Sequence, residues 1–172
     1  MAKTTYASLK LKTDTSVKEI EFNGSKIEVL QYLPIDDKYS LVNITLQKSK
    51  DGSIYHPLKK DMYFHLNLVY LYTNLSFTDK QREDESKLYD TLQSSGLLNL
   101  ILENIPEEEY EILYSFIEEY ERDILNYQNT IAGIIANLIE SLPARAEEMQ
   151  KIVDNFNPEN FQEVLNFARA IK

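Results

Sequence analysis

The sequence predicts an α+β fold, mostly α, in which an N-terminal antiparallel β-hairpin packs on a bundle of about five to seven helices. Three observations predict it: two alternating runs flank Asn23-Gly24, the apolar spacing from Asp36 onward is mostly three and four, and the segment after Pro106 keeps a heptad pattern. With 172 residues, of which 43% are hydrophobic, we expect one domain over 1–172, with a hairpin region 1–34 and a helical region 35–172.

The hairpin is predicted from two short runs, Val17–Phe22 and Ile27–Leu33, whose side chains alternate between apolar and polar. Asn23-Gly24 between them is a preferred pair for a type I′ turn, because both central positions need a positive φ. An earlier run, Tyr6–Lys12, offers a third strand through Leu9 and Leu11. Two or three strands are not stable alone in water, so they must pack on the helices.

The first helix is expected from Asp36, after Pro34 stops the strand. Tyr39, Val42, Asn43 and Leu46 give a stripe with helical spacing, widened by Leu41 and Ile44. The next apolar segment, Met62–Tyr72, is compatible with a strand, but its length favours a buried helix.

Thr78 and Gln81 have the spacing of a capping box, which predicts a helix from there to about Gln93. Gly96 is a natural C-terminal break, and Leu97–Leu102 then predicts a short apolar helix.

The longest predicted helix begins after Pro106, since proline suits a first helical position. Its apolar residues recur at alternating spacings of three and four, the a and d positions of a heptad: Tyr110, Leu113, Ile117, Tyr120, Ile124, Tyr127, Ile131, Ile134 and Leu138. A helix of this size would reach roughly 50 Å. Because that exceeds the core of a small domain, part of its face is expected to meet another chain or helix pair.

Two further helices are expected to close the chain. The first starts at Pro143, with Met149, Ile152 and Val153 facing inward, and the second starts at Asn157-Pro158.

The charge balance limits the classes of partner. A net charge of −10 and a pI of about 4.7 repel nucleic acid phosphates and anionic membranes and favour basic partners. The chain has no Cys, which excludes disulfides and thiolate zinc sites. No apolar run approaches the roughly 20 residues of a membrane span, and the first residues lack the apolar region of a signal peptide. We therefore expect a soluble intracellular protein with neither nucleic acid nor membrane as partner.

No pattern in the chain indicates catalysis. The four glycines are too far apart for a phosphate-binding loop, and the two histidines, His56 and His65, do not have metal-ligand spacing. His65 lies within an apolar run, so a packed and hydrogen-bonded core histidine is the simpler interpretation. We expect no enzymatic activity, no cofactor and no metal.

Acidic residues crowd the start of the long helix: Glu107, Glu108, Glu109, Glu111, Glu118, Glu119, Glu121 and Asp123, with Arg122 as the one base among them. This run is typical of a solvated polar face opposite the apolar stripe. The alternative hypothesis is that it imitates a phosphate backbone and inhibits a host defence protein or a DNA-binding protein.

Two stretches resemble small proteins encoded by phages of low-GC bacteria: IEVLQYLP at 27–34 and YTNLSFTDKQ at 72–81, with IPEEEY and NFNPENF as weaker matches. The family is that of virion and tail-morphogenesis proteins, whose N-terminal hairpin is similar to that of phage tail assembly chaperones. The resemblance implies a non-enzymatic structural or assembly role in the tail or head-tail region. It also implies the host cytoplasm during assembly as the location, with the virion as a second location.

The resemblance implies function through protein-protein contacts. A hairpin edge can extend a partner's sheet, and an apolar helix stripe with tyrosines can form subunit contacts. We expect phage structural proteins and further copies of the chain, in a homo-oligomer, as partners. The predicted partner-binding residues are Ile27, Val29, Gln31, Tyr110, Ile117, Tyr120, Ile124 and Tyr127.

Overall fold

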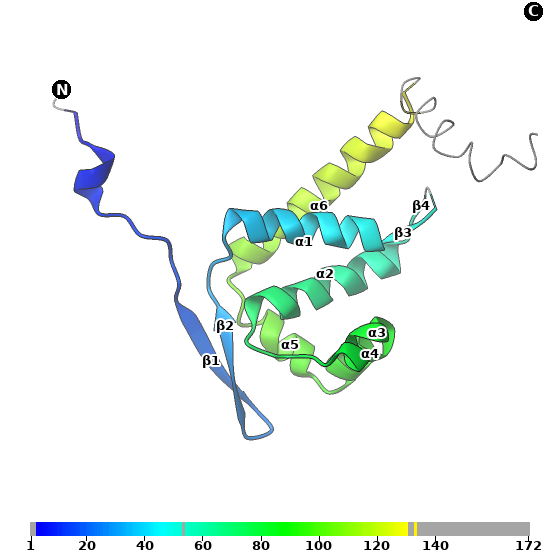
Figure 1. Cartoon of the computed structure of the whole chain (residues 1–172), viewed down its shortest axis with the longest axis horizontal. Coiled ribbons are helices and arrows are strands. Elements are labelled where there is room, and N and C mark those ends of the chain that lie inside the picture. The colour runs from blue at the N-terminus through cyan, green and yellow to red at the C-terminus, as the bar shows by residue number, and fades with distance from the viewer. Residues whose placement is uncertain (1–2, 53, 131–132, 134–172) are drawn as a thin grey trace, which may run out of the picture. The chain divides into compact units, whose positions relative to one another are not determined.

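The computed structural model describes residues 3–52, 54–130 and 133. The chain divides into two compact units, 1–121 and 122–172, and each is described by itself. The first unit confirms the predicted fold class: an N-terminal antiparallel hairpin precedes a set of helices (Figure 1). One domain over the whole of 1–172 stays a prediction.

The hairpin has the predicted strands and turn. β1 (Val17–Phe22) pairs antiparallel with β2 (Ser25–Leu30), and Ile20 lies opposite Ile27. Asn23 and Gly24 have φ values of 50° and 76°, as a type I′ turn requires. The segment offered as a third strand forms no strand. It begins instead with a short 3-10 helix, Tyr6–Leu9, none of whose residues is buried.

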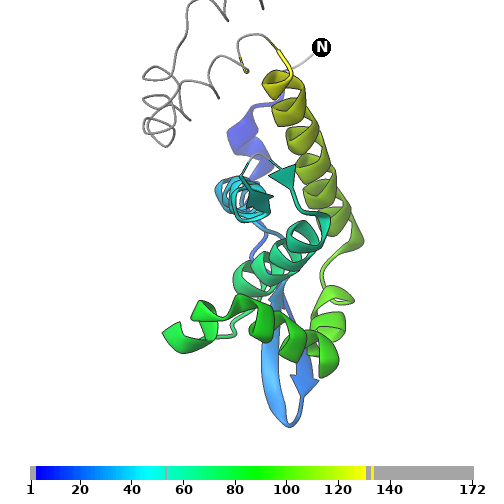
Figure 2. The ribbon, with the colours of Figure 1, turned by 90° about the vertical axis from the view of Figure 1, so that its right-hand side faces the viewer.

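α1 (Ile35–Lys48) and α2 (Pro57–Tyr72) pack side by side, as Figures 1 and 2 show. The helix interpretation of Met62–Tyr72 is therefore confirmed. The predicted stripe of α1 was partly wrong, because Tyr39 is 68% exposed, while Lys38 and Thr45 are buried beside Leu41. A second, very short hairpin, β3 (Lys50–Asp51) and β4 (Ile54–Tyr55), joins the two helices and was not predicted.

The capping box is present, but the helix that it starts is broken. α3 (Asp79–Glu83) begins with the reciprocal bonds between Thr78 and Gln81, and α4 (Glu85–Ser94) begins after Asp84. The carboxylate of Asp84 accepts the N–H of Lys87 at 3.1 Å, so Asp84 caps a new helix where one continuous helix was expected. Gly96, with φ 79°, separates α4 from α5 (Leu97–Leu102), as predicted.

The long helix α6 (Glu107–Gln128) starts as predicted and ends at Gln128, where residues 129 and 130 are no longer helical. Its 22 residues correspond to about 33 Å, which is shorter than the roughly 50 Å expected for the full heptad segment. The remaining heptad positions Ile131, Ile134 and Leu138, and the helices expected from Pro143 and Asn157-Pro158, lie outside the described residues.

The core of the first unit lies where α1, α2, α5, α6 and the inner face of the hairpin meet. Its largest fully buried side chains come from all of these elements: Val29, Leu33, Leu41, Leu46, Phe64, Leu66, Leu68, Tyr72, Leu98, Ile101, Leu113 and Ile117. Burying apolar area of this kind is the main favourable contribution to folding. It also fixes which faces of the hairpin and of α6 remain exposed.

Candidate functional site: two exposed protein-binding surfaces

The predicted partner residues on the hairpin do not form an exposed surface. Ile27 and Val29 are 3% and 0% exposed and belong to the core, which corrects their assignment to partner contacts. Because strand residues alternate, both point to the hairpin face that packs on the helices. The side-chain amide of Gln31 donates to the carbonyl oxygens of Val29 and Asn104, both at 3.1 Å, so Gln31 ties the hairpin to the end of α5.

The predicted helix residues of the first unit divide between core and surface. Ile117 is fully buried, so it is corrected to a core residue. Tyr110 is half-buried, and its ring lies 5.3 Å from that of Phe64. Tyr120 is 42% exposed and stays a candidate contact. In the second unit, Ile124 is half-buried and Tyr127 is exposed.

An exposed apolar stripe on α6 contains the predicted contact residue Tyr120 and two residues outside the heptad positions, Ile112 and Phe116. Ile112, Phe116 and Tyr120 are each 42% exposed and follow one another at a spacing of four, which places them on one face of the helix. This outer stripe lies beside the buried positions Leu113 and Ile117. Its signal was present in the sequence as apolar residues next to the a and d positions. Three large apolar side chains exposed together are typical of a contact surface.

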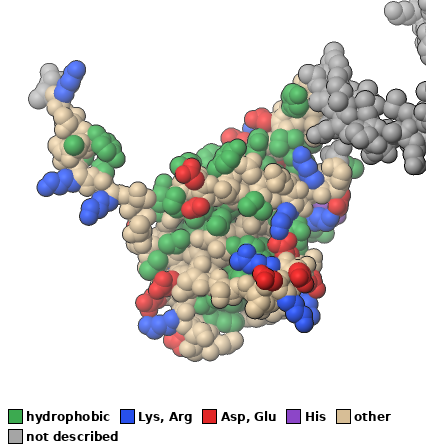
Figure 3. All heavy atoms as spheres, viewed as in Figure 1, with side chains coloured by type: hydrophobic (Ala, Val, Ile, Leu, Met, Phe, Trp, Pro, Cys, Tyr) green, Lys and Arg blue, Asp and Glu red, His purple; other side chains and the backbone are tan. Residues whose placement is uncertain are grey.

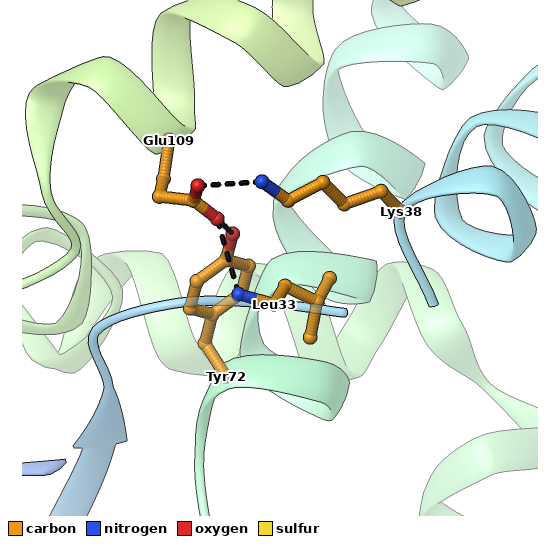
Figure 4. Close-up of polar contacts among 4 residues, drawn as sticks. All are labelled: Leu33, Lys38, Tyr72 and Glu109. Atoms are coloured by element: carbon orange, nitrogen blue, oxygen red, sulfur yellow. Dashed lines mark hydrogen bonds and ion pairs between the residues drawn. The ribbon is translucent and has the colours of Figure 1, made fainter. Parts of the chain in front are cut away.

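A buried carboxylate fixes the N-terminal turn of α6 against the rest of the unit (Figure 4). Glu109 is 8% exposed, and its carboxylate accepts three hydrogen bonds. The donors are the ammonium group of Lys38 at 2.5 Å, the phenol of Tyr72 at 2.8 Å and the backbone N–H of Leu33 at 3.1 Å. They come from α1, α2 and the segment after β2, so this one residue joins α6 to three other parts of the chain.

Two pKa values follow from this arrangement. Burial by itself raises the pKa of Glu109, but the bonds from Lys38, Leu33 and Tyr72 and the charge of Lys38 outweigh it, so the pKa lies below its ordinary value. Burial, followed by the bond to Glu109, raises the pKa of Tyr72 far above its ordinary range. The cluster therefore holds an ionised carboxylate and a protonated phenol at neutral pH, which suits a structural role.

Some of the acidic residues on α6 are not exposed to solvent, although the sequence suggested a solvated face. Glu109 lies in the buried cluster, and Glu121 is half-buried and pairs with Lys60 of α2 at 2.5 Å. Glu107, Glu108, Glu111, Glu118 and Glu119 are exposed. Two of the carboxylates that the mimicry hypothesis counted are therefore used to pack the helix.

The second candidate surface is the outer edge of β1. Gln31 donates its N–H to the carbonyl of Ser16 at 3.0 Å. This bond shows which residues of β1 turn their backbone N–H and C=O groups toward β2. The backbone groups of Val17, Glu19 and Glu21 therefore point away from β2. The opposite edge is occupied, since Glu28 accepts the N–H of Asn74 at 3.3 Å and donates to its side chain at 3.1 Å. Within the described part of the chain, β1 is thus the hairpin's open edge.

His65 occupies a polar cluster between α2, α4 and α6. Its Nε2 lies 3.3 Å from the hydroxyl of Tyr110, and its Nδ1 lies 3.3 Å from a carboxylate oxygen of Asp61, at an angle that makes no hydrogen bond. Burial and then the charge of Asp61 raise the pKa of Tyr110, which keeps its phenol protonated and a poor nucleophile. The packed core role expected for His65 fits this geometry.

A groove of about 460 Å³ lies along α3 and α4, lined by Thr78, Lys80, Gln81, Asp84, Lys87, Leu88 and Thr91. Thr78, Gln81 and Asp84 already cap these two helices. Across 3–52, 54–130 and 133, no group of three or more His, Asp or Glu side chains is placed to hold a metal ion. Over the same residues, no helix is long and apolar enough to cross a membrane.

Comparisons of the chain with protein-family models, with curated proteins and with solved structures gave no match. The resemblance to phage tail-morphogenesis proteins therefore stays a prediction from the sequence.

Proposed function

We propose that this chain is a non-enzymatic bacteriophage structural or assembly protein of the tail or head-tail region, which acts through protein-protein contacts. The observation that carries the proposal is the pair of exposed surfaces in the first unit: the open β1 edge, and the outer stripe Ile112, Phe116 and Tyr120. An open strand edge offers backbone hydrogen bonds to an added strand, and exposed aromatic residues serve as interface anchors.

The rigid attachment of α6 supports the proposal. Glu109 and the Lys60–Glu121 pair hold α6 at points 12 residues apart along the helix, and the outer stripe lies between them. A surface held in this way loses little conformational freedom on binding, which favours affinity.

The second candidate is an acidic mimic of nucleic acid that inhibits a host defence or DNA-binding protein. The five exposed glutamates at 107, 108, 111, 118 and 119 favour it. Such contacts between exposed charges weaken strongly with salt, whereas an apolar contact does not.

Affinity capture tests the proposal. A tagged chain is expressed during infection of a low-GC bacterial host, and the co-purifying proteins are identified by mass spectrometry. We expect phage tail or connector proteins at a fixed ratio, retained in high salt. Capture of a host nuclease or polymerase, released by salt, would overturn the proposal in favour of the inhibitor.

A further inference from the structure

The residues before β1 form an N-terminal arm, defined here as 3–16, in which every side chain is exposed. Tyr6, Leu9 and Leu11 are 77%, 53% and 61% exposed. The arm carries three lysines, Lys3, Lys10 and Lys12, against one acid, Asp14. Figure 3 shows basic and apolar side chains along the arm, and Tyr6, Leu11 and Lys12 line a shallow pocket with Tyr32. An arm with exposed leucines and a net positive charge is unusual for a chain of net charge −10.

Apart from the bond that Ser16 accepts from Gln31, the hydrogen bonds of the arm within the described residues are local. Ser8 donates its N–H and its hydroxyl to the carbonyl of Thr5, and Lys10 donates its N–H to Ala7. Lys10 has a φ of 49°, in the left-handed region that costs a residue with a side chain about 1 kcal/mol. A change to extended backbone would relieve this strain and would expose the N–H and C=O groups of 8–12 for pairing.

We propose that residues 8–12 of one copy add as a strand to the open β1 edge of a second copy. The alternation of apolar and charged side chains along 8–12 matches that along β1, on both faces of the strand. In 8–12, Leu9 and Leu11 point to one side and Lys10 and Lys12 to the other. In β1, Ile20 and Phe22 point to the core side, and Glu19 and Glu21 point to solvent.

Side chains of directly paired residues on neighbouring strands lie on the same face. One register therefore places the leucines of the arm beside Ile20 and Phe22 and its lysines beside Glu19 and Glu21. On that same solvent face of β2 lie Glu28 and Lys26, and the ammonium group of Lys26 pairs with Glu19 at 2.9 Å within the single chain. Reciprocal exchange of two arms forms a closed dimer.

The second copy is favoured over the chain's own β1 by the structure of the single chain. There the arm forms no strand on that edge, although only residues 13–16 separate 8–12 from β1. The inference rests on the proposed function, because it names a partner for the same open edge. The experiments distinguish failure of the inference from failure of the proposed function. Self-association is measured on the purified chain, without any phage protein.

The first test is analytical ultracentrifugation of the purified full-length chain across a concentration series. We expect a reversible change from 20.1 kDa to twice that mass. Glu21→Pro removes an outward N–H and leaves the bonds to β2 intact, so its dimer dissociation constant should rise at least about tenfold over that of the control Glu21→Ala. A wild type that stays at monomer mass throughout would overturn the inference. Equal dissociation constants for the two variants would do so too.

The second test does not depend on the tolerance of β1 for proline. One chain carries Lys10→Glu with Lys12→Glu, and a second chain carries Glu19→Lys with Glu21→Lys. Each alone places like charges together and should remain monomeric, whereas a mixture restores opposite charges at both exchanged contacts and should form the heterodimer. Absence of the heterodimer would show that the arm does not lie on that edge. If 8–12 paired instead with β1 of its own chain, both variants would be folded monomers and their mass would not change on mixing. That result would overturn the inference.

Discussion

Glu109 and Lys38, 71 residues apart in the sequence, form a buried ion pair of 2.5 Å between α6 and α1. Each is less than a tenth exposed. Removal of one partner from such a pair leaves an uncompensated buried charge and costs about 3–5 kcal/mol. Glu109→Ala, which also leaves Lys38 and the phenol of Tyr72 without their acceptor, should lower the free energy of unfolding by about that amount. Urea unfolding measures it.

The control is Glu108→Ala. Glu108 is the adjacent carboxylate on the same helical turn and is exposed. Its replacement should change the free energy of unfolding by about 0.5 kcal/mol or less. Equal effects of the two substitutions would contradict the assignment of Glu109 as the residue that attaches α6.

Glu109 should also make part of the free energy of unfolding depend on pH, so that this part is lost in acid. It is called here the acid-labile component. The pKa of Glu109 is lower in the folded chain than its ordinary value of 4.5, so the folded state favours the ionised form. This contribution is complete above the ordinary value and is lost as the pH falls through the folded pKa. In Lys38→Met the folded pKa rises toward the unfolded value, so the acid-labile component should become smaller. Urea midpoints measured between neutral pH and pH 3 follow the effect, and Glu109→Gln should lack this component.

Two isoleucines on α6 test the division between core and surface. Ile117 is fully buried and Ile112 is 42% exposed. Truncation of the buried one leaves a cavity, so Ile117→Ala should cost about 2–5 kcal/mol, against less than about 1 kcal/mol for Ile112→Ala. Thermal and urea unfolding of the two variants provide the comparison. A larger loss at position 112 would show that the outer stripe belongs to the fold.

The sequence was sufficient to predict the elements that depend on local chemistry. The turn at Asn23-Gly24 and the capping box at Thr78 and Gln81 use short-range rules, and both are present. The break at Asp84 follows from the same capping chemistry, since its carboxylate competes for the N–H of Lys87. The capping signals of Thr78 and Asp84 lie six residues apart, and the sequence prediction used the one at Thr78 alone.

The elements that depend on tertiary contacts could not be predicted in this way. Nothing near Glu109 in the sequence distinguishes it from Glu107 and Glu108, because its three donors come from residues 33, 38 and 72. Likewise the heptad pattern placed Leu113, Ile117 and Tyr120 on one face of the helix but did not show which of them the unit would bury. The core took Leu113 and Ile117 and left Ile112, Phe116 and Tyr120 exposed.

The most direct test of the central claim is affinity capture during infection with three tagged chains. The first is the wild type, the second carries Ile112→Glu with Phe116→Glu on the outer stripe, and the third carries Glu111→Gln with Glu118→Gln on the exposed acidic face. All three should remain folded, and urea unfolding checks this, since these positions lie at the surface. We predict that the wild type and the third chain capture phage structural proteins at the same ratio, and that the second loses them. Loss of capture by the third chain, with full retention by the second, would contradict the account and would make the acidic face the binding site.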